Sequence, residues 1–232
     1  MLNNKKIIAV VPAYNEESTI STVVVNLKKY ADCVVVVDDC SKDATALKAE
    51  SAGAVVLSHT VNGGYDRSID DGFKRARELG ADIFFTFDAD GQHQEEDILR
   101  IIQPIVDDVA DIVIGERPSI THFTEKIFAL YMSIRWKIKD PLCGLKGYSR
   151  EVYDSVGHFD TLGSIGTQLL VEGMMRGFRL KKIPIKITER SDVSRFYKKI
   201  IRANLKIAKA MFRVVILSIT YKWKTHRIVT GL

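Results

Sequence analysis

Two aspartates separated by one residue mark the chemistry that this sequence is best suited to perform. Asp88-Ala89-Asp90 follows the apolar run 83–87, and Gln92 comes two residues later. Two carboxylates this close together at the end of a buried strand repel each other, and a hard divalent cation would relieve the repulsion. Oxygens of Asp88, Asp90 and Gln92 could hold Mg²⁺ or Mn²⁺ and leave positions open for phosphate oxygens. The competing interpretation is a turn whose aspartates cap the next helix.

The elements that would position these residues form a regular series. Short apolar, β-branched runs typical of strands buried on both faces occupy residues 7–11, 34–37, 54–57, 83–87 and 112–114. Stretches with helical periodicity occupy residues 17–30, 44–52, 66–79 and 95–107 between them. This alternation predicts an α/β fold, a Rossmann-like, mainly parallel sheet flanked by helices.

Polar clusters follow the first three strands as well as the fourth. They read Pro12-Ala13-Tyr14-Asn15-Glu16-Glu17, Asp38-Asp39-Cys40-Ser41-Lys42-Asp43 and Asn62-Gly63-Gly64. Ligands of such sheets bind outside the carboxyl ends of the strands, so the clusters should converge on one rim. The first cluster contains no glycine-rich GxGxxG turn and the chain has no P-loop, which disfavours a dinucleotide cofactor.

The remaining segments give fewer signals. Residues 119–140 are apolar and aromatic, as in a helix beside a site or against lipid. A strand is expected at 145–148, a helix at 166–176, and an edge strand at 178–188 because it contains Pro184. Three cysteines without CxxC spacing make a disulfide framework or zinc site improbable and favour a reducing, cytosolic setting. The first residues lack the pattern of a signal peptide.

The C-terminal end carries a strong positive charge. After Asp192 the chain has ten basic residues and no acidic one. Within 197–219, basic residues recur at spacings of four, four, three and four (Lys198, Arg202, Lys206, Lys209 and Arg213). This pattern predicts a cationic amphipathic helix at an anionic membrane surface, too short in its apolar part to span the bilayer. The alternative is an ordinary helix packed on the domain; a nucleic-acid partner is not expected. We therefore divide the chain into a catalytic domain, 1–192, and a membrane-interface tail, 193–232.

The ordered motifs VVPAYNEE, VDDCSKDAT, NGG and FDADGQH together resemble the family 2 glycosyltransferases with the GT-A fold. Within that family the chain is similar to the dolichyl- and polyprenyl-phosphate sugar synthases. The resemblance covers about residues 6 to 195. It implies a donor nucleotide site made of Pro12, Tyr14, Glu16, Asp39, Asn62, Asp88 and Ala89. It also implies a metal held by Asp88, Asp90 and Gln92.

The same resemblance extends to residues near phosphates. Arg117 follows the fifth strand in Gly115-Glu116-Arg117, and Lys146 stands in Cys143-Gly144-Leu145-Lys146. By the resemblance, Asp88, Asp90, Arg117 and Lys146 are catalytic, and the acceptor phosphate meets Arg117, Arg190, Ser194 and Arg195. For single basic residues, a solvated surface charge is an equally common role.

The acceptor is predicted from a missing base. Sugar-hydroxyl acceptors must lose a proton to a carboxylate, whereas a lipid phosphate is already an anion. Gln168 occupies the position where the resembled subfamily generally has Glu, which favours a phosphate nucleophile, although Asp160 or Glu172 could supply a base.

We therefore expect a hexosyltransferase at the cytoplasmic membrane face, or the endoplasmic reticulum face in a eukaryote. It would use GDP-mannose, UDP-glucose or UDP-N-acetylglucosamine and a polyprenyl or dolichyl phosphate. A saccharide-hydroxyl acceptor and a non-catalytic, membrane-associated sugar-nucleotide-binding protein are the alternatives.

Overall fold

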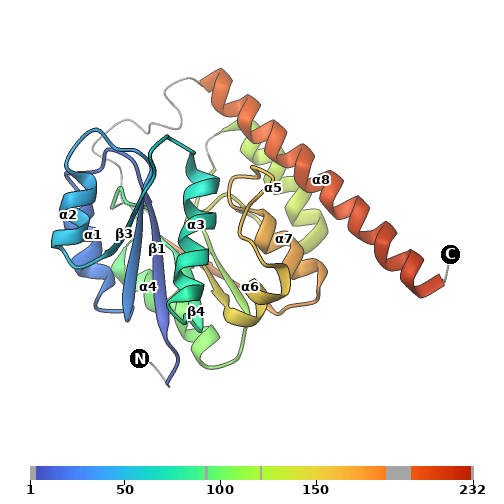
Figure 1. The fold of residues 1–232 in the computed structure, drawn as a ribbon. Coiled ribbons are helices and arrows are strands. Elements are labelled where there is room, and N and C mark those ends of the chain that lie inside the picture. The colour runs from blue at the N-terminus through green and yellow to red at the C-terminus, as the bar shows by residue number, and fades with distance from the viewer. Residues whose placement is uncertain (1–3, 92–93, 121, 187–199, 231–232) are drawn as a thin grey trace.

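A seven-stranded sheet forms the centre of the molecule (Figure 1). The computed structural model describes residues 4–91, 94–120, 122–186 and 200–230. Its strands are β1 (Ile7–Ala13), β2 (Cys33–Asp38), β3 (Val55–Ser58), β4 (Ile83–Thr86), β5 (Ile112–Glu116), β6 (Lys146–Ser149) and β7 (Leu180–Pro184). Their order in the sheet is β3-β2-β1-β4-β6-β5-β7. Only β6 runs antiparallel to its neighbours, so the predicted mainly parallel sheet is confirmed.

Helices cover both faces of this sheet and create two apolar cores. One face carries α1 (Ile20–Leu27), α2 (Thr45–Ser51) and α4 (Glu95–Val106). The other carries α3 (Tyr65–Glu78), α5 (Phe123–Trp136), α6 (Arg150–Val156), α7 (Gln168–Met175) and α8 (Ile200–Thr230). The central strands are apolar on both sides because each side meets a helical layer. Sequence patterns predicted these elements except α6, whose seven residues are too few to show a helical period.

The order of the strands changes direction at β1. β1 pairs with β2 on one side and with β4 on the other, in parallel register on both. The polypeptide therefore leaves β1 in one direction and returns to its other edge, and the loops after β1 and β4 separate at this point. Such switch points hold the ligand in open α/β sheets. The predicted edge strand is also confirmed, because β7 lies at the end of the sheet and stops at Pro184.

α8 both packs on the domain and keeps an apolar row in solvent. Its buried side consists of Ala203, Ile207, Ala210, Val214 and Ser218. Two large apolar side chains on another side of the helix, Leu205 and Phe212, are 57% and 64% exposed. Hydrogen bonds at 2.6 Å join Thr124 of α5 to Asn204 and Tyr131 of α5 to Ser218. The helix therefore has a packed side, an exposed apolar side and a basic side. No helix in the described part of the chain is long and apolar enough to cross a membrane.

Candidate active site at the strand ends

Asp88 lies at the end of β4 in close contact with the segment that precedes β6. Thr86 Oγ1 donates to the carbonyl oxygen of Gly144 at 2.5 Å and accepts from Lys146 N at 3.1 Å. These bonds bring residue 144 under the Asp88 carboxylate so closely that a Cβ there would lie 2.1 Å from Asp88 Oδ2. Glycine at position 144 is therefore required for the carboxylate to stand where it does.

The described residues are compatible with a metal shared between protein and substrate. No group of three or more His, Cys, Asp or Glu side chains in the described chain is arranged to enclose a cation. Asp88 and Asp90 follow the buried β4, and Gln92 lies outside the described residues. Mg²⁺ typically takes only one or two carboxylates from a protein and completes its shell with water and substrate phosphates. The residues present fit that mode of binding, and the predicted ligand set stays a prediction.

The loop after β1 is tied to the loop after β2. Asn15 adopts a left-handed conformation, with φ of 52°. Its backbone N–H donates to Ser41 Oγ at 2.8 Å, and its side-chain oxygen accepts from Lys42 N at 2.8 Å. Glu16 N donates to Thr45 Oγ1, also at 2.8 Å. These bonds hold the cluster that contains Pro12, Tyr14 and Glu16 beside the loop that follows Asp38 and Asp39.

Asp39 uses both carboxylate oxygens to hold the loop that precedes α3. The N–H groups of Gly63 and Gly64 donate to its two oxygens at 2.7 and 2.8 Å. His59 Nδ1 lies 2.8 Å from Asp39 Oδ1, and the Asn62 side chain donates to the Asp39 carbonyl at 3.1 Å. This buried aspartate therefore acts as an anchor for the predicted nucleotide-site loop.

Asp38, the neighbouring aspartate, has fewer hydrogen bonds than Asp39. Its Oδ1 is buried and has no hydrogen-bond partner among the described residues. Its Oδ2 accepts only a long bond, 3.4 Å, from Ser41 N. A buried carboxylate oxygen without a partner is costly, and such groups commonly await a ligand. The sequence interpretation assigned the nucleotide contact to Asp39, but Asp38 is the aspartate with an available oxygen.

Arg117 is fixed by a buried partner. Its guanidinium donates to both oxygens of Asp140 at 2.6 and 2.7 Å, and Glu125 lies 4.0 Å away. Burial alone would lower the pKa of Arg117, but its hydrogen bonds to Asp140 and the charge of that carboxylate outweigh burial and raise the pKa further. Arg117 is therefore a permanent, rigidly held cation at the end of β5.

Lys146 is a buried lysine at the start of β6, and the charges of the site carboxylates act on it. Its Nζ donates to the carbonyl oxygen of Gly166 at 2.7 Å. Burial lowers the pKa of Lys146, and the nearby acidic groups, including Asp140, Asp160 and Asp88, oppose that effect. Because its charge is screened little in this environment, Lys146 can stabilise negative charge near Asp88.

Asp66 was not identified from the sequence. Its Oδ1 accepts from Gly166 N at 2.9 Å. Burial, with the charge of Asp160 adding to it, raises the pKa of Asp66 to about 6. An acidic residue in the first turn of a helix is ordinary, so the sequence contained no signal for this environment.

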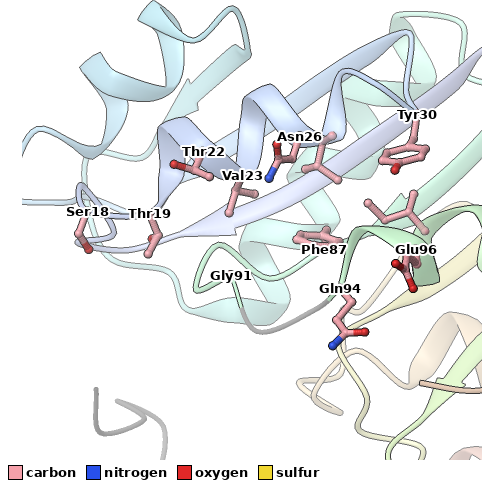
Figure 2. A pocket seen from close by; sticks show the side chains of 12 residues that line it. Ser18, Thr19, Thr22, Val23, Asn26, Tyr30, Phe87, Gly91, Gln94 and Glu96 are labelled. Carbon is pink, nitrogen blue, oxygen red and sulfur yellow. The ribbon is translucent and has the colours of Figure 1, made fainter. Parts of the chain in front are cut away.

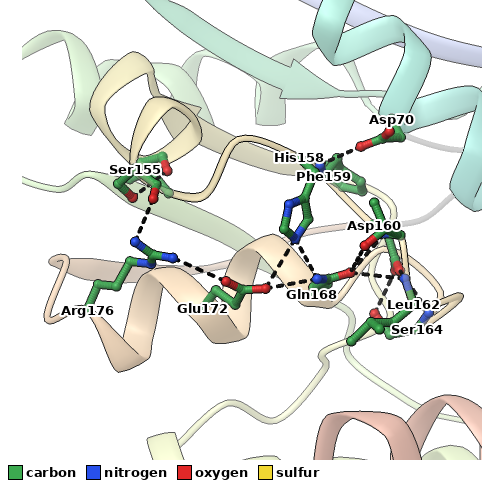
Figure 3. A network of polar contacts seen from close by, with 12 residues as sticks. Asp70, Ser155, His158, Phe159, Asp160, Leu162, Ser164, Gln168, Glu172 and Arg176 are labelled. Carbon is green, nitrogen blue, oxygen red and sulfur yellow. Dashed lines mark hydrogen bonds and ion pairs between the residues drawn. The ribbon is translucent and has the colours of Figure 1, made fainter. Parts of the chain in front are cut away.

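Asp160 and Glu172, the two carboxylates considered as bases, are both engaged in hydrogen bonds (Figure 3). Asp160 accepts from the N–H groups of Leu162, Ser164 and Gly166 and from the Ser164 hydroxyl. Glu172 Oε1 accepts from Gln168 Nε2 at 2.8 Å. These carboxylates shape the loop before α7.

Gln168 connects this network through both ends of its amide. Its oxygen accepts from Thr161 N at 2.8 Å and Leu162 N at 3.1 Å, while its nitrogen donates to Glu172. A glutamate could accept the first two bonds but could not donate the third. The hydrogen bond that its amide nitrogen donates to Glu172 therefore explains why glutamine, and not glutamate, fits this position.

A separate cavity of 730 Å³ lies between α1 and α4, and Gly91 is one of the residues that line it (Figure 2). Its described lining includes Asn26, Tyr30, Phe87 and Gln94 but none of the predicted site residues. The predicted acceptor residues Arg190, Ser194 and Arg195 lie outside the described residues.

The sequence is similar to those of two transferases that act on lipid phosphates. An undecaprenyl-phosphate mannosyltransferase of Micrococcus luteus is 28% identical over 211 residues, 80% of this chain and 84% of that protein. A UDP-N-acetylglucosamine–dolichyl-phosphate N-acetylglucosaminyltransferase of Methanococcus voltae is 41% identical over 132 residues, 49% of this chain and about half, 53%, of that protein.

Solved structures share the fold. Glucosyl-3-phosphoglycerate synthase of Mycobacterium tuberculosis, in complex with Mn²⁺ and UDP-glucose, superposes with a TM-score of 0.73 at 20% identity, over 91% of this chain and 79% of that chain. The model of glycosyl transferase family 2 matches residues 8–157, more than half of the chain. The convergent loops after β1, β2 and β4 and this match lead to one conclusion: the chain belongs to glycosyltransferase family 2, with the GT-A fold.

Proposed function

We propose that this protein transfers a hexose from a nucleoside-diphosphate sugar to a polyprenyl or dolichyl phosphate, in a metal-dependent reaction. The names of its relatives support this acceptor class. The observation that carries the proposal is the placement of an exposed apolar and basic helix, α8, beside a strand-end site that contains the fixed cation Arg117 and the buried side chain of Lys146. A lipid substrate with a charged head requires both features.

The donor would lie in the crevice between the loops after β1 and β4. Pro12, Tyr14 and Glu16 would line its nucleotide. The buried Oδ1 of Asp38 could accept a hydrogen bond from a base N–H or a ribose hydroxyl, which would satisfy its missing partner. Asp39 would contribute indirectly, by holding the loop with Asn62.

Asp88 and Asp90, with Gln92, would hold Mg²⁺ or Mn²⁺, and Ala89 would contact the donor between them. A divalent cation in this position neutralises charge that grows on a departing diphosphate. Lys146 stabilises the same charge from the protein side, because it is buried and close to Asp88. The acceptor phosphate would meet Arg117 and the segment with Arg190, Ser194 and Arg195.

A phosphate nucleophile agrees with the state of the nearby carboxylates. Asp160 accepts four or more hydrogen bonds from its own loop, and Glu172 is bonded to Gln168. Neither is placed as an unoccupied base. A phosphate oxygen already carries the charge needed for attack, so positioning and charge stabilisation suffice.

The acceptor's lipid tail would be reached from a membrane surface. Large apolar side chains are exposed at helical spacings on two packed helices, and together we name them the α5–α8 apolar face: Phe123, Ile127, Leu130 and Ile134 of α5, with Leu205, Phe212, Ile216 and Ile219 of α8. The basic side of α8 carries Arg202, Lys206, Lys209 and Arg213. This combination fits the interface of an anionic bilayer, with the protein bound peripherally.

One observation favours a second candidate, a saccharide-hydroxyl acceptor. The pKa of Asp66 is raised to about 6, which is suitable for a general base. The variant Asp66→Asn separates the two functions, because its amide oxygen can still accept from Gly166 N. Loss of a base costs roughly a hundredfold or more in kcat. Transfer to phosphate should fall by less than about tenfold, the value of one hydrogen bond.

The experiment that tests the proposal uses the full chain, lipid extract, Mn²⁺ and a panel of labelled nucleotide sugars. We expect label in the organic phase with at least one donor. The label should disappear with EDTA and fall by at least about a hundredfold in Asp88→Asn, because the departing diphosphate would lose its counter-charge. Absence of organic-phase label with every donor would overturn the proposal.

A further inference from the structure

The loop between α6 and α7, residues 157–167, has an unusual backbone. Gly157, Gly163, Ile165 and Gly166 all have left-handed conformations, with φ of 85°, 68°, 56° and 67°. Ile165 is the notable member, since a β-branched residue strongly disfavours this region. Such a conformation persists only where surrounding contacts impose it. The contacts of this loop therefore determine its shape more than its local sequence does.

Two side chains, Asp160 of the loop and Gln168 of α7, bind the loop's backbone between residues 161 and 166. The Asp160 carboxylate gathers the N–H groups of Ser164 at 3.0 Å and Gly166 at 2.8 Å. The Gln168 side-chain oxygen holds the N–H groups of Thr161 and Leu162 (Figure 3). These bonds tie the backbone of residues 161–166 to the side chains of Asp160 and Gln168.

One residue of the loop, Gly166, is hydrogen-bonded to two side chains of the candidate active site. Gly166 N donates to Asp66 Oδ1 of α3 at 2.9 Å, and Gly166 O accepts from Lys146 Nζ at 2.7 Å. Lys146 is the buried lysine on which the charge of Asp88 acts. A displacement of Gly166 would thus change the position of the Lys146 ammonium relative to the departing diphosphate.

Another peptide of the same loop is bonded to α8. Arg213 Nη1 donates to the Gly163 carbonyl oxygen at 2.9 Å. A Cβ at position 163 would lie 2.5 Å from that nitrogen, so a larger residue there would displace the guanidinium from its present place. The positive charge of Lys206, about two helical turns before Arg213 in α8, acts on the Asp66 carboxylate. Two basic residues of the proposed membrane helix therefore face the loop and its anchor.

We propose that the 157–167 loop couples membrane docking of α8 to the active site, with Arg213 as the positioning residue that transmits it. The proposal rests on the proposed function and deepens it. When the α5–α8 apolar face enters a bilayer, α8 becomes fixed and Arg213 holds Gly163. Gly166 and Lys146 are then fixed in turn. Catalysis is thereby favoured at the membrane, where the acceptor is found.

The test compares Arg213→Ala with the control Lys209→Ala. Both variants remove one positive charge from an exposed position of α8, but in the described structure only Arg213 is bonded to the loop. Amide hydrogen exchange of Leu162, Ser164 and Gly166 is measured with and without vesicles that contain anionic lipid. In the parent protein, vesicles should slow exchange about threefold to tenfold, the range of one charged hydrogen bond. Lys209→Ala should keep this response, and Arg213→Ala should lose it.

A kinetic readout accompanies the exchange measurement. With a short, water-soluble polyprenyl phosphate, Arg213→Ala should lower kcat about threefold to tenfold and leave the KM for the donor unchanged, and its loss of kcat should clearly exceed that of Lys209→Ala. Arg213→Lys, which retains a donor, should recover part of the loss. Equal behaviour of Arg213→Ala and Lys209→Ala in both assays would overturn the coupling. Exchange that responds to vesicles in a protein without transferase activity would overturn the proposed function instead.

Discussion

At the scale of single residues, two adjacent aspartates at the end of β2 have different roles. Asp39 accepts from Gly63 N, Gly64 N and His59, so its charge holds a loop in place. Asp38 has a buried oxygen without a partner among the described residues. Sequence spacing could not separate the two, because neighbouring residues leave a strand end in opposite directions and only the fold decides which one meets the loop.

This difference predicts opposite outcomes for two matched variants. Asp39→Asn should lower the free energy of unfolding by roughly 1–3 kcal/mol, because it weakens charge-assisted bonds to buried N–H groups. Asp38→Asn should leave stability nearly unchanged but weaken donor binding about tenfold. Thermal unfolding and calorimetric titration with nucleotide sugar and Mn²⁺ measure the two quantities. Equal loss of donor affinity in both variants, without a change in stability, would contradict these roles.

Asp66 predicts a pH-dependent change in stability. Its pKa rises from 3.8 to about 6 on folding, because burial and Asp160 disfavour its charge more than Lys206 and Lys146 favour it. The protonated folded state is thus preferred, so the parent protein loses stability as the pH rises from about 4 through 6. Asp66→Asn does not ionise. It should match the parent at pH 4 and exceed it by roughly 2 kcal/mol at pH 8, as measured by urea unfolding. A constant difference across this range would show that the Asp66 pKa is not raised.

At the scale of elements, α5 and α8 form a surface that neither helix would form alone. Hydrogen bonds from Thr124 and Tyr131 to α8 hold the two exposed apolar rows beside each other. The helical period of the tail was evident from the sequence. Which of its sides packs on α5 was not, because that choice depends on a neighbour far away in the chain. The antiparallel direction of β6 was unpredictable for the same reason.

The α5–α8 apolar face predicts membrane binding. Ile134→Ser and Phe212→Ser, at positions 79% and 64% exposed, should each lower partitioning to anionic vesicles about threefold to thirtyfold. Leu47→Ser is the matched control, because Leu47 is 66% exposed on α2, which covers the other face of the sheet. Vesicle flotation measures the binding. Equal losses in the control and in the two variants would exclude a specific docking face.

At the scale of the whole molecule, the strand-end loops and one helical layer of the sheet have different roles. The loops after β1, β2 and β4 build the donor side, and the α3–α5–α7–α8 layer connects that site to the exposed apolar face. The sequence predicted the sheet, its mainly parallel order and the convergence of polar clusters, because each follows from local periodicity and chain order. It did not predict the environment of Asp66 or the bonds of the 157–167 loop to Lys146, Asp66 and Arg213, because these join residues 20, 100 and 50 positions apart. The division into residues 1–192 and 193–232 stays a prediction.

The central claim is that a lipid-borne phosphate, activated by no base, attacks the sugar donor. Its most direct test offers the purified protein two acceptors with the same short polyprenyl chain, one ending in a phosphate and one in a hydroxyl, with Mn²⁺ and the donor found active. Mass spectrometry identifies the products. The account predicts a glycosyl phosphodiester from the polyprenyl phosphate and no product from the polyprenol. Comparable glycosylation of the hydroxyl, or a product from the polyprenol alone, would contradict it.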